Sequence, residues 1–214
     1  MELTGAEIVC ESLLKEGADV CFGLPGGAVL PLYGALSSYP AIRHILVRHE
    51  QAAAMAADGY SRATGKPGIL LTSTGPGAAD SVGALGEAYF SSSSVLEICT
   101  NVEQEFIGSG KLSTHETKNQ LGMFEAVTDW NAMINQVESI PDHFMEAFDR
   151  FQTRRPRPIE LEIPTNLLGT QADVEILTAR EPNIPKGDPN KVEQAMQMLL
   201  KAKRPAIMVG EEVQ

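Results

Sequence analysis

Short apolar runs alternate with helical patterns along the first 168 residues, and this alternation restricts the fold more than any other feature. Parallel strands need helical crossovers between them. The order therefore predicts an α/β fold: a doubly wound, mostly parallel six-stranded sheet with helices on both faces. The predicted strands comprise residues 20–22, 42–47, 69–72, 95–99, 130–134 and 159–163. The predicted helices comprise residues 4–16, 30–36, 50–64, 78–90 and 141–153.

The second strand runs directly into the charged residues Arg48, His49 and Glu50, and an alanine-rich helix follows at once. This places Glu50 at the carboxyl edge of the sheet, where parallel sheets bind ligands. A helix N-terminus is also electropositive, because its first N–H groups have no partner. Glu50 is therefore compatible with two roles. It is either an acid that complements the helix dipole, or a partly desolvated carboxylate that exchanges a proton with a heterocycle nitrogen.

Two glycine-containing segments, 23–27 and 73–77, follow the first and third strands. Neither matches Gly-x-Gly-x-x-Gly or a P-loop, so each alone is typical of a tight turn. Together they flank Glu50 on one edge of the sheet, which indicates a ligand site. His49 and His115 are either acid–base groups or ordinary polar residues. The serine run at 91–94 lacks the context of a hydrolase nucleophile.

Composition excludes several classes of function. The chain has 28 acidic against 17 basic residues and a formal net charge of −11, which disfavours nucleic acid as a partner. Cys10, Cys21 and Cys99 lie in apolar runs without metal-ligand spacing, so we expect buried free thiols and no metal site. No apolar run approaches the roughly 20 residues of a membrane span. We therefore expect a cytoplasmic protein without membrane contact.

The sequence changes character after residue 168. Prolines and glycines punctuate residues 169–189, which we expect to form a linker after an N-terminal domain of residues 1–168. Residues 190–214 show helical spacing followed by an apolar run at 204–210, predicted to be a buried strand. One helix and one strand cannot bury a core. We therefore expect residues 190–214 to be the truncated start of a second, central domain.

Four segments carry a resemblance to a known family. Residues 3–168 resemble the N-terminal, pyrimidine-binding domain of thiamine-diphosphate enzymes, nearest the acetolactate synthase-like group, and residues 190–211 resemble the start of that family's central domain. The matching segments are Phe22-Gly23-Leu24-Pro25-Gly26-Gly27, Arg48-His49-Glu50-Gln51-Ala52-Ala53 with Asp58-Gly59-Tyr60-Ser61-Arg62-Ala63-Thr64-Gly65, Thr72-Ser73-Thr74-Gly75-Pro76-Gly77, and Arg157-Pro158-Ile159-Glu160-Leu161-Glu162-Ile163-Pro164.

The resemblance implies a 2-oxo acid carboligase or decarboxylase that uses thiamine diphosphate. It implies that Glu50 is catalytic: it hydrogen-bonds the aminopyrimidine ring and so promotes loss of the thiazolium C2 proton. Substrate contacts are implied for Ala28 and His115. The implied cofactor-binding residues are Pro25, Gly26, Gly27, Glu50, Pro76, Asp80 and Asn101.

Departures from the family pattern leave the substrate open. Asp80 and Asn101 stand where the family often has Asn and Gln, residues 91–94 are serines in place of Asp-Ser-x-Pro, and residues 114–116 replace Phe-Gln-Glu. The Gly-Asp-Gly…Asn segment that binds Mg²⁺ in the family is absent from these residues. The resemblance implies that another subunit of a homodimer or tetramer donates it, with FAD a further candidate cofactor.

Three interpretations follow. The chain is a fragment of a longer acetolactate synthase-like enzyme and inactive alone, or it is the pyrimidine-domain subunit of a split 2-oxo acid decarboxylase of the sulfopyruvate type. The third is a non-catalytic assembly domain, against which the intact Glu50 argues.

Overall fold

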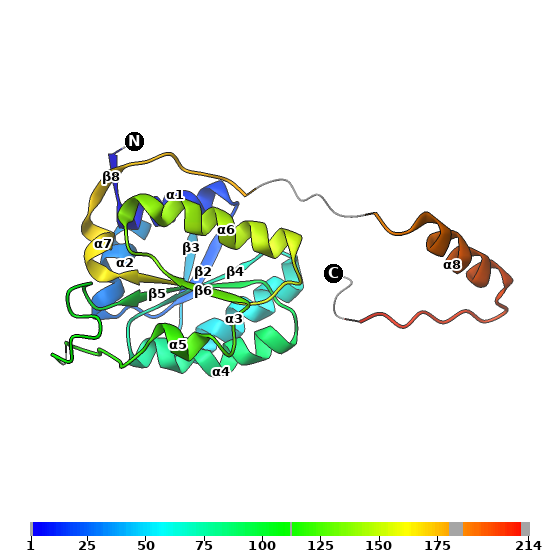
Figure 1. Ribbon diagram of the computed structural model, residues 1–214, viewed down its shortest axis with the longest axis horizontal. Helices are drawn as coiled ribbons and strands as arrows, with labels where there is room; N and C mark the ends of the chain where they lie inside the picture. The colour runs from blue at the N-terminus through cyan, green and yellow to red at the C-terminus, as the bar shows by residue number, and fades with distance from the viewer. Residues whose placement is uncertain (1, 112, 180–185, 211–214) are drawn as a thin grey trace.

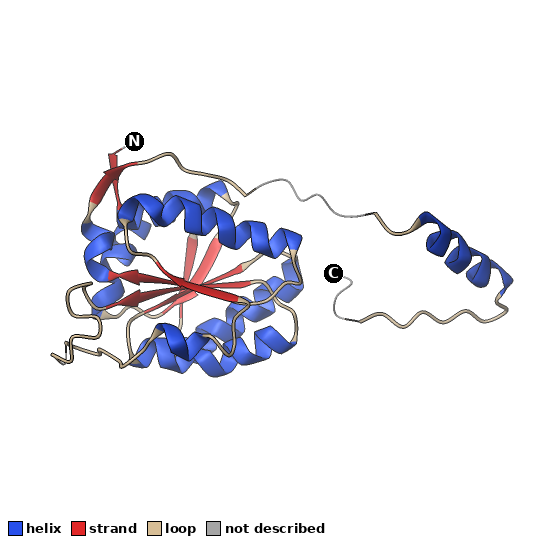
Figure 2. Ribbon diagram, viewed as in Figure 1, coloured by secondary structure: helices blue, strands red, loops and turns tan. Residues whose placement is uncertain are grey.

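A computed structural model describes residues 2–111, 113–179 and 186–210. Its centre is a six-stranded sheet in which every neighbouring pair of strands is parallel, with helices on both sides (Figures 1 and 2). The strand order is β3-β2-β4-β5-β7-β6, which confirms the predicted doubly wound sheet. These strands are β2 (Val20–Gly23), β3 (Arg43–Leu46), β4 (Gly68–Thr72), β5 (Val95–Asn101), β6 (Trp130–Met133) and β7 (Ile159–Pro164).

Two helical layers cover the sheet, and each closes a separate apolar cluster. In β4, Ile69 and Leu71 pack into one cluster while Leu70 packs into the other, as expected for a strand buried on both faces. The first layer contains α1 (Gly5–Lys15), α2 (Leu30–Leu36), α6 (Ile140–Thr153) and α7 (Thr165–Gly169). The second contains α3 (Glu50–Thr64), α4 (Pro76–Phe90) and α5 (Leu121–Phe124). Short 3-10 turns, η1 (Gly27–Val29) and η2 (Val137–Ser139), precede α2 and α6.

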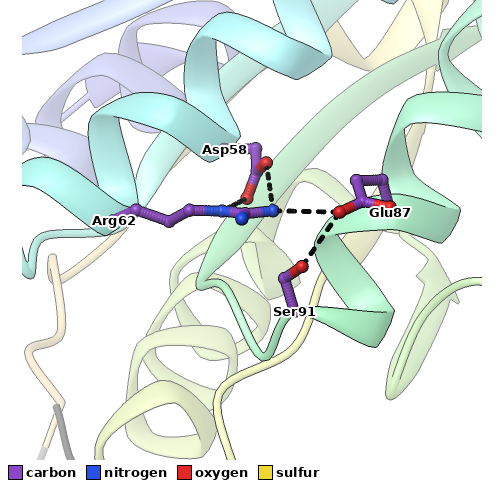
Figure 3. Close-up of polar contacts among 4 residues, drawn as sticks. All are labelled: Asp58, Arg62, Glu87 and Ser91. Carbon is purple, nitrogen blue, oxygen red and sulfur yellow. Dashed lines mark hydrogen bonds and ion pairs between the residues drawn. The ribbon is translucent and has the colours of Figure 1, made fainter. Parts of the chain in front are cut away.

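A polar network ties α3 to α4 at the ends farthest from Glu50 (Figure 3). The Arg62 guanidinium donates to both carboxylate oxygens of Asp58, at 2.9 and 2.7 Å, and lies 3.5 Å from Glu87 Oε1 on α4. Ser91, just after α4, donates to the same Glu87 oxygen at 3.0 Å. Because α3 begins with Glu50 and α4 with Pro76, this network helps fix how the two starts lie relative to each other.

The segment predicted as a linker begins with an element that the sequence did not indicate. Strand β8 (Gln171–Asp173) pairs antiparallel with β1 (Glu2–Thr4) in a separate two-stranded sheet. Beyond β8, the side chains of Val174, Ile176 and Ala179 pack against the core on the α1 side. The first part of the expected linker therefore lies on the N-terminal domain, and its residues 180–185 lie outside the described residues.

Of the two elements predicted within residues 190–214, the structure contains one. Helix α8 (Pro189–Lys201) forms where helical spacing predicted one, but it has no buried residue and lies apart from the sheet in Figure 1. The prediction of a strand at 204–210 is wrong, because this segment is irregular and Met208 is 100% exposed. A strand needs a neighbour to satisfy its backbone groups, and the described residues offer it none. Residues 211–214 lie outside the described part.

No helix within the described ranges combines the length and apolar character that crossing a membrane requires. The three cysteines are free and buried, which confirms that part of the sequence analysis.

Candidate functional site

Glu50 is the first residue of α3, four positions after β3 ends at Leu46, so the predicted strand-to-helix junction is confirmed. His49 caps the helix, and its Nδ1 accepts the backbone N–H of Gln51 at 3.2 Å. The Glu50 side chain is half-buried, and its carboxylate has no hydrogen-bond partner or ion pair among the described residues. A carboxylate left free at a sheet edge is available to a ligand donor.

The turn after β4 lies directly against Glu50. A Cβ built on Gly77 would lie 3.1 Å from Glu50 Oε1, so the glycine lets the first turn of α4 approach the carboxylate. Gly75, the N-cap of α4, has a φ of 67°, a left-handed conformation that favours glycine. Pro76 then starts the helix at a position that proline favours. The structure thus brings Glu50, Pro76 and Gly77 together.

The turn after β2 reaches the same place. A Cβ on Gly26 would lie 2.6 Å from Ser73 Cβ, so the two turns touch there and no larger residue fits. Pro25 is exposed, and a Cβ on Gly27 would meet no other described atom within 4 Å. Pro25 and Gly27 therefore border open space beside the joined turns.

Asp80 lies one turn into α4, with its Oδ2 3.6 Å from His49 Nε2. Ligand atoms of His49, Glu50 and Asp80 all lie within 4.8 Å of one another. His49 Nδ1 accepts a backbone N–H, so the proton of the neutral ring is on Nε2, facing Asp80. A metal ion would have to displace this proton and break the helix cap. The arrangement therefore fits a polar contact between an imidazole N–H and a carboxylate better than a metal site.

Asn101, at the end of β5, is buried and faces into the protein. Its Nδ2 donates to Glu162 Oε1 at 2.6 Å, and its Oδ1 accepts the N–H of Val102 at 2.7 Å. Both ends of the amide are therefore engaged by the protein itself. Its role in lining a pyrimidine pocket stays a prediction.

A cavity of about 390 Å³ lies beside the two turns, a volume that suits a small ligand. It brings together Ala28 and His115, the two residues for which the sequence predicted substrate contact. His115 has a φ of 68°, and its carbonyl packs against Gly75. The lining, several members of which the sequence did not single out, is Gly27, Ala28, Thr74, Val102, Glu103, Phe106, Ser113, Thr114, His115 and Thr165.

Three carboxyl groups are buried beneath the site, between the sheet and the α4 layer. Glu97 is 0% exposed, and its Oε1 lies 2.6 Å from Thr72 Oγ1; burial, together with the charge of Glu50, raises its pKa to about 8. Burial also raises the pKa of Glu160, whose two oxygens have no hydrogen-bond partner among the described residues, and that of Glu162.

The burial of these acids is not indicated by the sequence. Glu160 and Glu162 alternate with apolar residues in β7, a pattern typical of a half-exposed strand. Glu162 is covered by Asn101 and Gln120, which bond its two carboxylate oxygens, and no local pattern indicates these contacts. Gln120, directly before α5, is not singled out by the sequence either, although it is buried and contacts the turn after β4.

The residues present fit the aminopyrimidine part of thiamine diphosphate. The Glu50 carboxylate is free to accept a hydrogen bond, and Gly77 keeps side-chain atoms away from it. The open side of Gly27 and the adjoining cavity leave room for a ligand next to the joined turns.

Comparison with known proteins agrees with this geometry. Residues 3–126 match the family described as thiamine pyrophosphate enzyme, N-terminal TPP binding domain. The acetolactate synthase large subunit of Buchnera aphidicola subsp. Schizaphis graminum is 35% identical over 97% of this chain and 37% of its own length. The acetolactate synthase isozyme 2 large subunit of Escherichia coli (strain K12) is 37% identical over 97% of this chain and 37% of its own length. A probable acetolactate synthase large subunit of Methanocaldococcus jannaschii is 35% identical over 97% of this chain and 36% of its own length.

The chain thus spans somewhat more than a third of the length of these relatives. The family match covers Glu50 and both glycine turns, and the relatives align with nearly all of this chain. The chain therefore belongs to the thiamine pyrophosphate enzyme family, of which it carries the N-terminal cofactor-binding domain.

Proposed function

We propose that this chain supplies the aminopyrimidine half of a thiamine-diphosphate site in an enzyme that acts on 2-oxo acids. The relatives' names suggest that the activity of this enzyme is most similar to that of the large catalytic subunit of acetolactate synthase. The observation that carries the proposal is the free, half-buried Glu50 carboxylate between the turns that contain Gly26 and Gly77.

Glu50 would accept a hydrogen bond from a ring nitrogen of the aminopyrimidine and hold a proton there. The N-terminus of α3 stabilises the negative charge of this carboxylate while it does so. Gly26, Gly27, Pro76 and Asp80 would border the ring. When bound, thiamine diphosphate supplies a carbon nucleophile and an electron sink for bond cleavage beside the carbonyl of a 2-oxo acid.

The cavity next to this site would take the substrate. Ala28 and His115 lie on its wall together with Thr74 and Thr165. We further propose that the diphosphate and its Mg²⁺ are held by another domain, contributed by a second subunit of a homodimer or larger assembly. A carboligase fits the names of the relatives better than a simple decarboxylase.

The test uses the full-length protein that carries this chain. Calorimetric titration with thiamine diphosphate in the presence of Mg²⁺ is expected to give saturable binding. Pyruvate is then added, and carbon dioxide, acetolactate and acetaldehyde are measured. Acetolactate formation supports the carboligase, and acetaldehyde alone would reduce the proposal to a decarboxylase. Absence of thiamine-diphosphate binding would refute it.

A further inference from the structure

The buried carboxamide of Gln120 joins the turn after β4 to the central strands. Its Oε1 accepts the Gly75 backbone N–H at 2.7 Å and the Thr74 hydroxyl at 2.9 Å. Its Nε2 donates to the Thr100 carbonyl at 2.9 Å and lies 3.2 Å from Glu162 Oε2. Gln120 is only 3% exposed, so water cannot replace these partners without rearrangement. One side chain thus fixes the turn against β5 and β7.

The turn depends on this support. Gly75 is the N-cap of α4, and no side-chain capping hydrogen bond is present there. In a capping box, a Glu or Gln in the first turn accepts the N-cap backbone N–H. Gln120 provides that acceptor from outside the helix. Two residues after Gly75, Gly77 faces Glu50 Oε1, so a displaced turn would change the surroundings of that carboxylate.

Glu162 sets the orientation of the Gln120 amide. One Glu162 oxygen accepts Asn101 Nδ2 at 2.6 Å, and the other accepts Gln120 Nε2. Because a carboxylate accepts hydrogen bonds, it draws the NH₂ end of Gln120 toward itself and leaves the oxygen for the turn. Burial raises the pKa of Glu162, and the two amide donors act in the opposite direction.

We propose that Gln120 is a positioning residue for Glu50: it holds the Thr74–Gly75 turn in the conformation that places Gly77 against the carboxylate. This inference rests on the proposed thiamine-diphosphate function, because it concerns how Glu50 is presented to the aminopyrimidine ring. Gln120 itself does not touch that ring. Its loss is expected to impair proton exchange even when the cofactor site is saturated.

The experiment compares the full-length protein with Gln120→Leu, Gln120→Glu and Gln104→Leu. Gln104 is a matched control: it lies at the other end of the same loop, where its side chain bonds Asn166 and the carbonyl of Asn135. Three quantities are measured: the Kd for thiamine diphosphate by calorimetry, the exchange rate of its C2 proton by NMR at saturating cofactor, and the melting temperature.

Gln120→Leu is expected to slow C2-proton exchange at least tenfold, equivalent to about 1.4 kcal/mol, and to raise Kd, while Gln104→Leu matches wild type in both. Gln120→Glu keeps the acceptor but sets a second carboxylate against Glu162, so it is expected to slow exchange as well; it decides the question if Gln120→Leu does not fold. Adding Glu162→Gln to Gln120→Glu returns an N–H donor to this contact and is expected to recover part of the rate.

A lowered melting temperature with wild-type exchange at saturating cofactor would show that Gln120 is merely structural and would overturn the inference. The proposed function has its own control in the same data. A wild-type protein that does not bind thiamine diphosphate refutes that function and this inference together. Wild-type binding combined with normal exchange in both Gln120 variants refutes the inference alone.

Discussion

Replacing Glu97 with Gln is expected to change how the stability of the protein depends on pH. Glu97 lies on β5, fully buried, with Thr72 Oγ1 2.6 Å and Ser81 Oγ 2.8 Å from its carboxyl oxygens. Burial and the nearby charge of Glu50 raise its pKa from 4.5 to about 8. The folded protein therefore keeps a proton on Glu97 at pH values where the unfolded chain has lost it.

The sign of the effect follows from proton binding in the two states. Between pH 4.5 and about 8 the folded state holds one proton more than the unfolded state at Glu97, so the free energy of unfolding falls as pH rises. One proton corresponds to a slope of about 1.4 kcal/mol per pH unit, and to a loss of about 5 kcal/mol over the whole window. Gln carries no titrating proton and keeps an oxygen for Thr72 and Ser81.

The assay is urea unfolding of the wild type and of Glu97→Gln at pH 5, 6, 7 and 8. The variant is expected to lose stability less steeply, by up to about 1.4 kcal/mol per pH unit. The residual slope would come from Glu160 and Glu162, whose pKa values burial also raises. Glu125→Gln, at an exposed position, is the control and should run parallel to wild type. Parallel curves for wild type and Glu97→Gln would refute the reasoning.

Further substitutions test the supports of the site. Arg62→Ala leaves the buried Asp58 carboxylate without its two hydrogen-bond donors. The free energy of unfolding, measured in urea, should fall by about 1–2 kcal/mol. An unchanged free energy of unfolding would show that this network does not hold α3 against α4. Gly75→Ala forces a side chain into a left-handed backbone and should lower the free energy of unfolding by about 2 kcal/mol or more. It should also weaken the binding of thiamine diphosphate. Its control, Gly83→Ala, has open space within α4 and should stabilise by about 0.5–1 kcal/mol. Equal effects of the two glycine variants would contradict the account of the turn.

Local patterns in the sequence sufficed for the sheet and for the position of Glu50. Strands buried on both faces leave continuous apolar runs such as residues 69–71, and an abrupt change to charged residues marks where α3 starts. Sequence reasoning could therefore place Glu50, Pro76 and the glycine turns at one sheet edge. Their contact, through Gly26 with Ser73 and Gly77 with Glu50, needed the structure.

Other features depend on contacts between distant segments and leave no periodic signal. Strand β8 forms by pairing with β1, which is distant from it in the sequence but lies beside it in the structure. The segment 204–210 has strand-like composition, yet no described residue offers it a partner strand. No sequence motif singles out Gln120, and its importance appears only in its hydrogen bonds to Thr74 and Gly75.

The central claim is that Glu50 exchanges a proton with the cofactor's aminopyrimidine ring. Its most direct test is the exchange rate of the C2 proton of thiamine diphosphate bound to the full-length protein, measured by NMR for wild type, Glu50→Gln and the Glu125→Gln control. Glu50→Gln keeps the side-chain length but cannot hold the proton, so exchange should slow by about 10²–10⁴-fold while the control is unchanged. Exchange at the wild-type rate in Glu50→Gln, with the cofactor bound, would contradict the account.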